Sequence, residues 1–249
     1  MHHSDPFETL AIADDRAWPD QVDAIDLCGL AVSRTNRGDV EPLRGLLRHS
    51  EAAVRRRGLW IFSELTGVGF RLFDDALWAV DETDIATVCS LLDGVLSYAR
   101  KLEPAQISAL LQLGDQADDL ARSRLIVVIG ASAPSKVLAA IDMLPSDVRA
   151  GHAVAVKAGD LVTDVTSDTF DEARKLDGLA GLYAWAQLFR IAARREHDDF
   201  PFEDSADDFI AERLRFEIVR RSRRYLESRR VRQDYFRRSE AKRNKKRNK

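Results

Sequence analysis

The sequence predicts an all-α fold made of stacked helix pairs. Seven prolines and thirteen glycines among 249 residues are few for an all-β chain, which needs many turns. Apolar residues instead recur at the spacing of amphipathic helices, and a helix–turn–helix pattern of about 30 residues returns along the chain. Since one such pair cannot bury its apolar face alone, stacked neighbours must supply a continuous core.

The clearest helix pair lies at residues 40–67. Its first helix has a short apolar stripe and leads into a polar turn that contains His49. Its second helix has a longer stripe, and we expect Gly67 to end it. The first stripe consists of Leu43, Leu46 and Leu47, and the second of Val54, Gly58, Ile61, Phe62 and Leu65.

Weaker copies of the second helix begin at Val88, Leu120 and Val148, so that the four starting positions, Val54 included, lie 34, 32 and 28 residues apart. We expect these four side chains to mark the entrances of inner helices in the stack. Two further helices are predicted at residues 21–33 and 176–194, the first as part of an N-terminal cap.

The unit at 40–67 resembles a HEAT-type repeat, including its Val54-Arg55 pair, and Val148-Arg149 repeats that pair. The resemblance to HEAT-like and armadillo-type α-solenoid proteins covers roughly residues 20–195. It implies an α-solenoid at residues 1–195. It also implies binding of protein or nucleic acid more often than enzymatic activity.

The run Leu125–Ile129 is the longest unbroken apolar segment, and it could be either a buried strand or a buried helix. Asp118 and Asp119 come shortly before it, as is typical of a helix N-terminus. No second strand of similar quality alternates with helices. We therefore predict a helix here.

The last 39 residues differ sharply in charge from the rest of the chain. Residues 211–249 hold 17 of the 38 basic side chains and 5 of the 41 acidic ones, a net charge of +12, which leaves −15 on residues 1–210. We predict an acidic linker at 196–204, a long helix at 205–240 that becomes basic, and a disordered basic tail at 241–249.

The basic arm is the strongest candidate binding site. Arginine pairs phosphates or carboxylates through two parallel hydrogen bonds, and interleaved aromatic rings can stack on bases. The partner could be nucleic acid (RNA more than DNA), an acidic protein, or the chain's own acidic body; alternatively, the arm is only solvated. The candidate cations are Arg220, Arg221, Arg223, Arg224, Arg229, Arg230, Arg232, Arg237, Arg238, Lys242, Arg243, Lys245, Lys246 and Arg247, and the candidate stacking residues are Tyr225, Tyr235 and Phe236.

No catalytic, metal or cofactor site is predicted. The two cysteines lie in apolar runs and are expected to be buried thiols, and the histidines lack ligand spacing. Trp60 and Trp185 fall on apolar stripes and are expected in the core. One enzymatic exception is a HEAT-like DNA glycosylase, for which Tyr183, Trp185 and Arg190 share a helix without matching that family's motif.

No apolar run approaches the length of a membrane span, and no signal peptide is recognised at the acidic start. We therefore expect a cytoplasmic protein that acts as a non-enzymatic scaffold. In this interpretation the solenoid surface binds a partner protein and the basic arm adds electrostatic contacts. The alternative is a nucleic-acid-binding protein in which the basic arm is the main site.

Overall fold

The computed structural model describes residues 5–12, 22–114, 118–145, 175, 176 and 178–192. Within these ranges every regular element is helical and none is a strand, which confirms the predicted all-α class. The α-helices are α1 (Pro6–Ile12), α2 (Val22–Asn36), α3 (Glu41–Leu47), α4 (Ala52–Ser63), α5 (Phe73–Ala76), α6 (Ile85–Leu96), α7 (Pro104–Leu111), α8 (Asp119–Ala131), α9 (Pro134–Asp142) and α12 (Gly178–Ala192). The 3₁₀ helices are η2 (Gly67–Leu72), η3 (Leu77–Asp81) and η4 (Ala99–Lys101).

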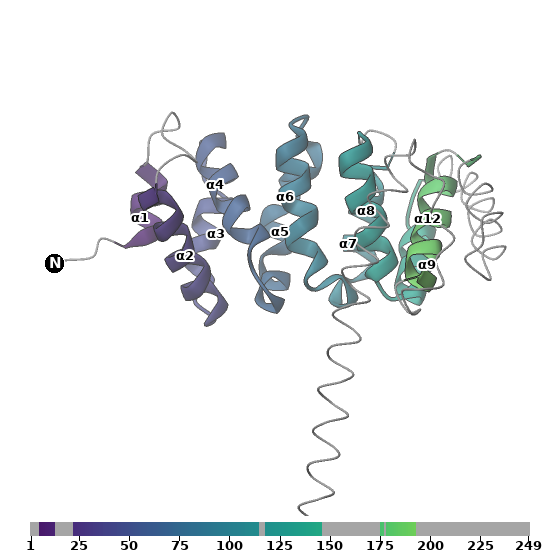
Figure 1. Ribbon diagram of the computed structural model, residues 1–249, viewed down its shortest axis with the longest axis horizontal. Coiled ribbons are helices and arrows are strands. Elements are labelled where there is room, and N and C mark those ends of the chain that lie inside the picture. The colour runs from purple at the N-terminus through teal and green to yellow at the C-terminus, as the bar shows by residue number, and fades with distance from the viewer. Residues whose placement is uncertain (1–4, 13–21, 115–117, 146–174, 177, 193–249) are drawn as a thin grey trace, which may run out of the picture.

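The helices follow one another along the long axis of the molecule (Figure 1). The first row consists of α4, α6, α8 and α12, each packed on the next. The second row contains α3, α7 and α9. In it α7 packs on α9, while α3 packs on α4 of the first row. The buried apolar side chains form a single cluster between these rows. At the N-terminal end, α1 packs on α2, and α2 packs on α4.

The helices of the first row run in the same direction. A side chain at Gly94, near the end of α6, would meet Phe62 near the end of α4. Arg122 in the first turns of α8 donates to the carbonyl of Gly178, where α12 begins. Arg190, near the end of α12, donates to the carbonyl of Gly130 near the end of α8. The C-termini of these helices therefore lie along one edge of the molecule.

Helix starts are encoded differently in the two rows. Pro42, Pro104 and Pro134 occupy the first turns of α3, α7 and α9, where a proline loses no intrahelical hydrogen bond and its φ already suits a helix. In contrast, α6 and α8 begin after Asp84 and Asp118, whose carboxylates accept backbone N–H bonds from Thr87 and Ala121. An aspartate cap satisfies a free N–H group and complements the helix dipole.

The run Leu125–Ile129 is helical and lies in α8, as predicted. Residues 125–130 are all buried because α6 packs on one side of α8, α12 on another, and α7 also touches it. A helix that is apolar on all sides has no amphipathic period. Because this segment has no helical period, its sequence pattern is also compatible with a buried strand.

The predicted stripes of the 40–67 unit are buried throughout, and His49 lies in the turn between α3 and α4. The predicted helix stop at Gly67 is wrong, because α4 ends at Ser63. The amides of Glu64 and Leu65 donate to the carbonyls of Ile61 and Phe62, so the last turn closes without a left-handed residue. Gly67 instead begins η2, and it is not among the described glycines with positive φ.

Of the four predicted entrance residues, Val54 and Val88 are buried in α4 and α6. Leu120 is only half-buried in the first turn of α8, and Val148 lies outside the described residues. The helices predicted at 21–33 and 176–194 correspond to α2 and α12, with different ends. The predicted segments 196–204, 205–240 and 241–249 also lie outside the described residues.

Candidate interaction surfaces

One side of α2, α4 and α6 remains open to solvent. Exposed positions recur at helical spacing on each helix, so that each presents a ridge. Leu30 on α2 is 57% exposed and Trp60 on α4 is 36% exposed, and Asp93 is exposed on α6. We call this surface, defined by Leu30, Arg56, Trp60, Ser90 and Asp93, the open face.

The exposure of Trp60 contradicts the prediction that it lies in the core. Trp60 follows Leu59 and precedes Ile61, both fully buried, but it points from the opposite side of α4.

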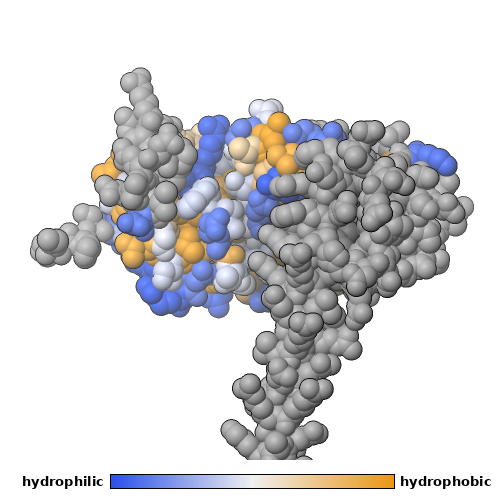
Figure 2. All heavy atoms as spheres, viewed as in Figure 1, coloured by the Kyte–Doolittle hydropathy of each residue, from blue (hydrophilic) through white to orange (hydrophobic). Residues whose placement is uncertain are grey.

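The open face ends at α8, where Arg124 donates to Asp93 at 2.9 Å. On the side of the molecule visible in Figure 2, the apolar areas are small and lie between hydrophilic ones.

A second surface lies at the edge formed by the C-termini of the first row. Phe70 on η2 is 44% exposed, and Lys101 Nζ lies 4.8 Å from the centre of its ring. Gly69 makes this approach possible, because a Cβ there would lie 2.9 Å from a ring carbon of Tyr98. Arg71 and Arg100 are exposed beside them in sequence. We call Phe70, Arg71, Arg100 and Lys101 the basic edge.

The cations of the basic edge have no carboxylate partner among the described residues. Of the neighbouring carboxylates, Glu103 forms an ion pair with Lys136, whose Nζ lies 2.8 Å from Glu103 Oε1, whereas Asp74 accepts a hydrogen bond from the neutral Gln106 amide at 3.2 Å. The three cations of the basic edge thus form no ion pair within the described residues, on a body whose residues 1–210 are acidic overall. Such a surface attracts anionic groups.

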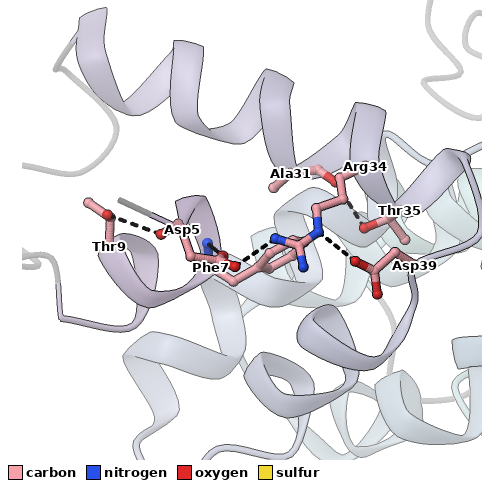
Figure 3. Close-up of polar contacts among 7 residues, drawn as sticks. All are labelled: Asp5, Phe7, Thr9, Ala31, Arg34, Thr35 and Asp39. Atoms are coloured by element: carbon pink, nitrogen blue, oxygen red, sulfur yellow. Dashed lines mark hydrogen bonds and ion pairs between the residues drawn. The ribbon is translucent and has the colours of Figure 1, made fainter. Parts of the chain in front are cut away.

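Most other charged clusters join helices together. Arg34 on α2 reaches Asp5 Oδ2 at 2.6 Å and Asp39 Oδ2 at 2.5 Å (Figure 3). Its guanidinium also lies 5.5 Å from the ring centre of Phe7. The hydrogen bond from Arg34, followed by that from the Phe7 amide, holds the pKa of Asp5 below its ordinary value. This cluster ties the start of α1 and the α2–α3 turn to α2.

Asp75 forms a second such cluster between α5 and α3. Its side chain is 4% exposed, and its carboxylate accepts from Arg44 Nε at 2.8 Å and Arg48 Nε at 2.5 Å. Arg44 also pairs with Glu41, whose side chain is 73% exposed. The buried carboxylate is thus fully paired, as a buried charge must be.

Asp75→Asn should lower the free energy of unfolding by about 1–2 kcal/mol, because the amide cannot accept both guanidinium hydrogen bonds. The two arginines can still reach water, which keeps the loss below that of a fully buried pair. Urea unfolding measures the change. Glu41→Gln is the matched control and should cost less than about 0.5 kcal/mol; equal effects of the two substitutions would contradict the assignment.

The N-cap of α6 gives a pH-dependent prediction. Asp84 Oδ2 accepts from Thr87 Oγ1 at 2.5 Å and from the Thr87 amide at 3.1 Å. These hydrogen bonds, that of the hydroxyl first, lower the pKa of Asp84. A lowered carboxyl pKa stabilises the fold above the unfolded-state pKa, and this stabilisation is lost as the pH falls through the folded-state pKa.

Asp84→Ala should therefore cost about 0.5–2 kcal/mol at pH 7. The difference from wild type should shrink once the pH falls below about 4, where the carboxyl of the unfolded chain takes up its proton. Urea titrations at a series of pH values measure this. A difference that stays constant down to pH 3 would show that the charged carboxylate is not the cap.

The three side chains compared with DNA glycosylases are all buried in α12. Tyr183, Trp185 and Arg190 are each less than a tenth exposed, as was predicted for Trp185. Arg190 donates to the carbonyls of Ile129, Gly130 and Ser132 at 3.3, 3.2 and 3.5 Å. It thereby places positive charge at the C-terminus of α8, where the helix dipole favours it.

Cys28 and Cys89 are both buried and free of disulfides, as predicted. Burial raises the pKa of Cys28 to about 12. Burial also raises the pKa of Cys89, although the nearby positive charge of Arg124 acts to lower it. Arg124 Nη1 lies 3.2 Å from Cys89 Sγ. Both side chains are therefore protonated thiols at neutral pH, and a protonated thiol is a poor nucleophile.

The predicted basic arm lies entirely outside the described residues. This includes all of the cations from Arg220 to Arg247 and the aromatic residues Tyr225, Tyr235 and Phe236. His2, His3, His152 and His197 are likewise outside, and the side chain of His49 accepts a hydrogen bond from the Glu51 amide. The described part of the chain contains no group of three or more His, Cys, Asp or Glu side chains able to hold a metal ion.

Over the described ranges, no single helix is long and apolar enough to cross a membrane. Only α8 and α9 taken together reach that length and composition, and the chain bends by 116° between them. Comparison with known proteins gives no identification: no family model, no curated protein and no solved structure matches this chain.

Proposed function

We propose that this chain is a non-enzymatic, cytoplasmic interaction scaffold whose helix rows form an α-solenoid of the HEAT-like type. The open face binds a partner protein, and the basic C-terminal arm adds electrostatic contacts. The two free, buried cysteines suit a reducing compartment.

The repeat spacing supports the solenoid part of this proposal. Pro42 and Pro104 lie 62 residues apart, and α5, which packs on α3 in the second row, begins at Phe73, halfway between them. Pro134 follows Pro104 after a further 30 residues. Helices of the second row therefore start at nearly constant intervals, and a stack of such units exposes long flanks that proteins use for binding.

The observation that carries the proposed function is the open face itself. A tryptophan and an arginine on α4 and a leucine on α2, which packs on α4, stand exposed, and tryptophan and arginine are enriched among residues that dominate binding energy. Apart from the basic edge, most described clusters of charged side chains instead fasten helices to one another, as at Arg34, Asp75 and Arg190.

The experiment is quantitative affinity capture from the source cells with the full-length protein and two variants. Trp60→Glu places a charge in the open face, while Met143→Glu changes an exposed residue at the end of α9 (56% exposed) and is the matched control. We expect a partner protein that wild type and Met143→Glu recover equally and that Trp60→Glu loses. Equal recovery by all three folded proteins would contradict a role for the open face.

The alternative function is nucleic-acid binding through the arm, favoured by the net charge of +12 on residues 211–249. A gel shift with generic RNA and DNA tests it, using the full-length chain and a truncation that ends at Glu203. If six to ten phosphates are contacted, affinity should fall roughly 10³–10⁵-fold between 50 and 200 mM salt. Salt-sensitive binding that the truncation abolishes supports this alternative, and no shift at low salt removes it.

A further inference from the structure

The basic edge needs an anionic partner, and the chain itself contains a matching segment. Residues 196–208 read Glu-His-Asp-Asp-Phe-Pro-Phe-Glu-Asp-Ser-Ala-Asp-Asp, with seven carboxylates and two phenylalanines. The edge offers complementary groups without a carboxylate partner among the described residues: Lys101, which lies against the exposed ring of Phe70, and the exposed arginines Arg71 and Arg100, which are next to these two residues in the sequence. We propose that residues 196–208 dock on the basic edge of the same molecule.

The position of α12 makes this contact geometrically possible. Arg190 fixes the end of α12 beside the end of α8 through the carbonyls of Ile129 and Gly130. Since the first-row helices are parallel, Ala192 lies at the same edge of the molecule as Lys101, which follows the end of α6. The chain beyond Ala192 therefore leaves the described fold on the side where the basic edge is located.

The connecting chain is also long enough. Adjacent packed helices are about 8–10 Å apart, so the two steps from α12 through α8 to α6 cover about 16–20 Å. Phe70 lies slightly farther along, towards α4. Residues 193–200 can span about 26–29 Å when extended, which brings Phe200 within reach of Phe70 and the carboxylates of 196–199 within reach of Lys101 and Arg100.

The contact has two physical components. Carboxylates of the segment pair with Arg71, Arg100 and Lys101, and the aromatic side chains of Phe200 or Phe202 cover the exposed ring of Phe70. Exposed ion pairs are individually weak, so several must act together with the aromatic contact. Docking of 196–208 on the basic edge would also fix the point on the molecule from which the basic residues beyond 208 extend. The docked segment would compete with external anions for Arg71, Arg100 and Lys101.

Carbodiimide coupling tests this directly, because it joins an amine to a carboxylate only where the two are in contact. The full-length protein is coupled at low concentration and the joined peptides are identified by mass spectrometry. Lys136 and Glu103, 2.8 Å apart, are the internal control. A mixture of light and isotope-labelled protein distinguishes coupling within one chain from coupling between two.

We expect Lys101 to be joined to a carboxylate of residues 196–208 within one chain. The double variant Arg71→Glu, Arg100→Glu should lose most of this product while the Lys136–Glu103 product is unchanged. The proposal is wrong if the control product forms without the Lys101 product, or if the Lys101 product forms only between chains, which would indicate a second copy. It is also wrong if the double variant weakens RNA binding while wild type gives no Lys101 product.

Discussion

Replacing Ile61 by aspartate should unfold the protein. Ile61 lies in the last turn of α4, is completely buried, and belongs to the apolar cluster that joins the helix rows. An unpaired charge at such a position costs several kcal/mol, against a total stability of about 5–15 kcal/mol. Far-ultraviolet circular dichroism and the yield of soluble protein measure the outcome, and Leu65→Asp should behave in the same way.

Ile85→Asp is the control for this experiment. Ile85 is the first residue of α6 and is 44% exposed. An aspartate in the first turn of a helix interacts favourably with the helix dipole, so this variant should fold with little change in stability. A folded, native-like Ile61→Asp protein would mean that α4 does not pack through this side chain.

Gly94→Ala should destabilise the protein by about 3 kcal/mol or more, at the upper end of the range for overpacked cores. An added Cβ would lie 2.5 Å from two ring carbons of Phe62 and 3.0 Å from its carbonyl oxygen. Phe62 is itself fully buried, so its ring has no free space to move into. The substitution therefore forces α4 and α6 apart, which urea unfolding would detect.

Gly45→Ala is the matched control, since nothing lies within 4 Å of a Cβ at this position in α3. Alanine is the better helix former by roughly 0.8–1 kcal/mol, so this variant should be slightly more stable than wild type. The two substitutions add the same methyl group to a helix and should change stability in opposite directions. Changes of the same sign would contradict the described packing of α4 against α6.

The sequence alone predicted the helices that have one apolar side. In α4, the stripe from Val54 to Phe62 follows the helical period because only one side faces the core. The pattern was ambiguous in α8, where Leu125–Ile129 is buried on all sides. It also misassigned Trp60, because periodicity does not decide whether a large residue at the margin of a stripe is covered by a neighbouring helix.

The sequence also marks the starts of several helices through residue types that suit a first turn. Prolines open three helices of the second row, and aspartate caps open α6 and α8. These residues mark helix starts more sharply than the entrance positions used for the repeat, of which Leu120 is only half-buried. Proline and aspartate mark these boundaries because each suits the first turn of a helix for a separate physical reason.

The candidate surfaces could not be predicted in the same way. Phe70 and Lys101 meet only because η2 lies against the end of α6, with Gly69 touching Tyr98. Arg190 resembled a candidate functional residue in the sequence, whereas the fold places it at the C-terminus of α8. Contacts between helices from different pairs depend on how those pairs stack, and single-sequence patterns do not specify that stacking.

The most direct test of the scaffold proposal compares the affinity of the captured partner for wild type, Trp60→Glu, Met143→Glu and the truncation ending at Glu203. If the open face makes the main contact, Trp60→Glu should weaken binding about 30-fold or more, corresponding to a dominant residue worth about 2 kcal/mol. Met143→Glu should bind as wild type, and the truncation should cause a smaller, salt-dependent loss. Unchanged affinity of Trp60→Glu together with abolished binding by the truncation would contradict the proposal.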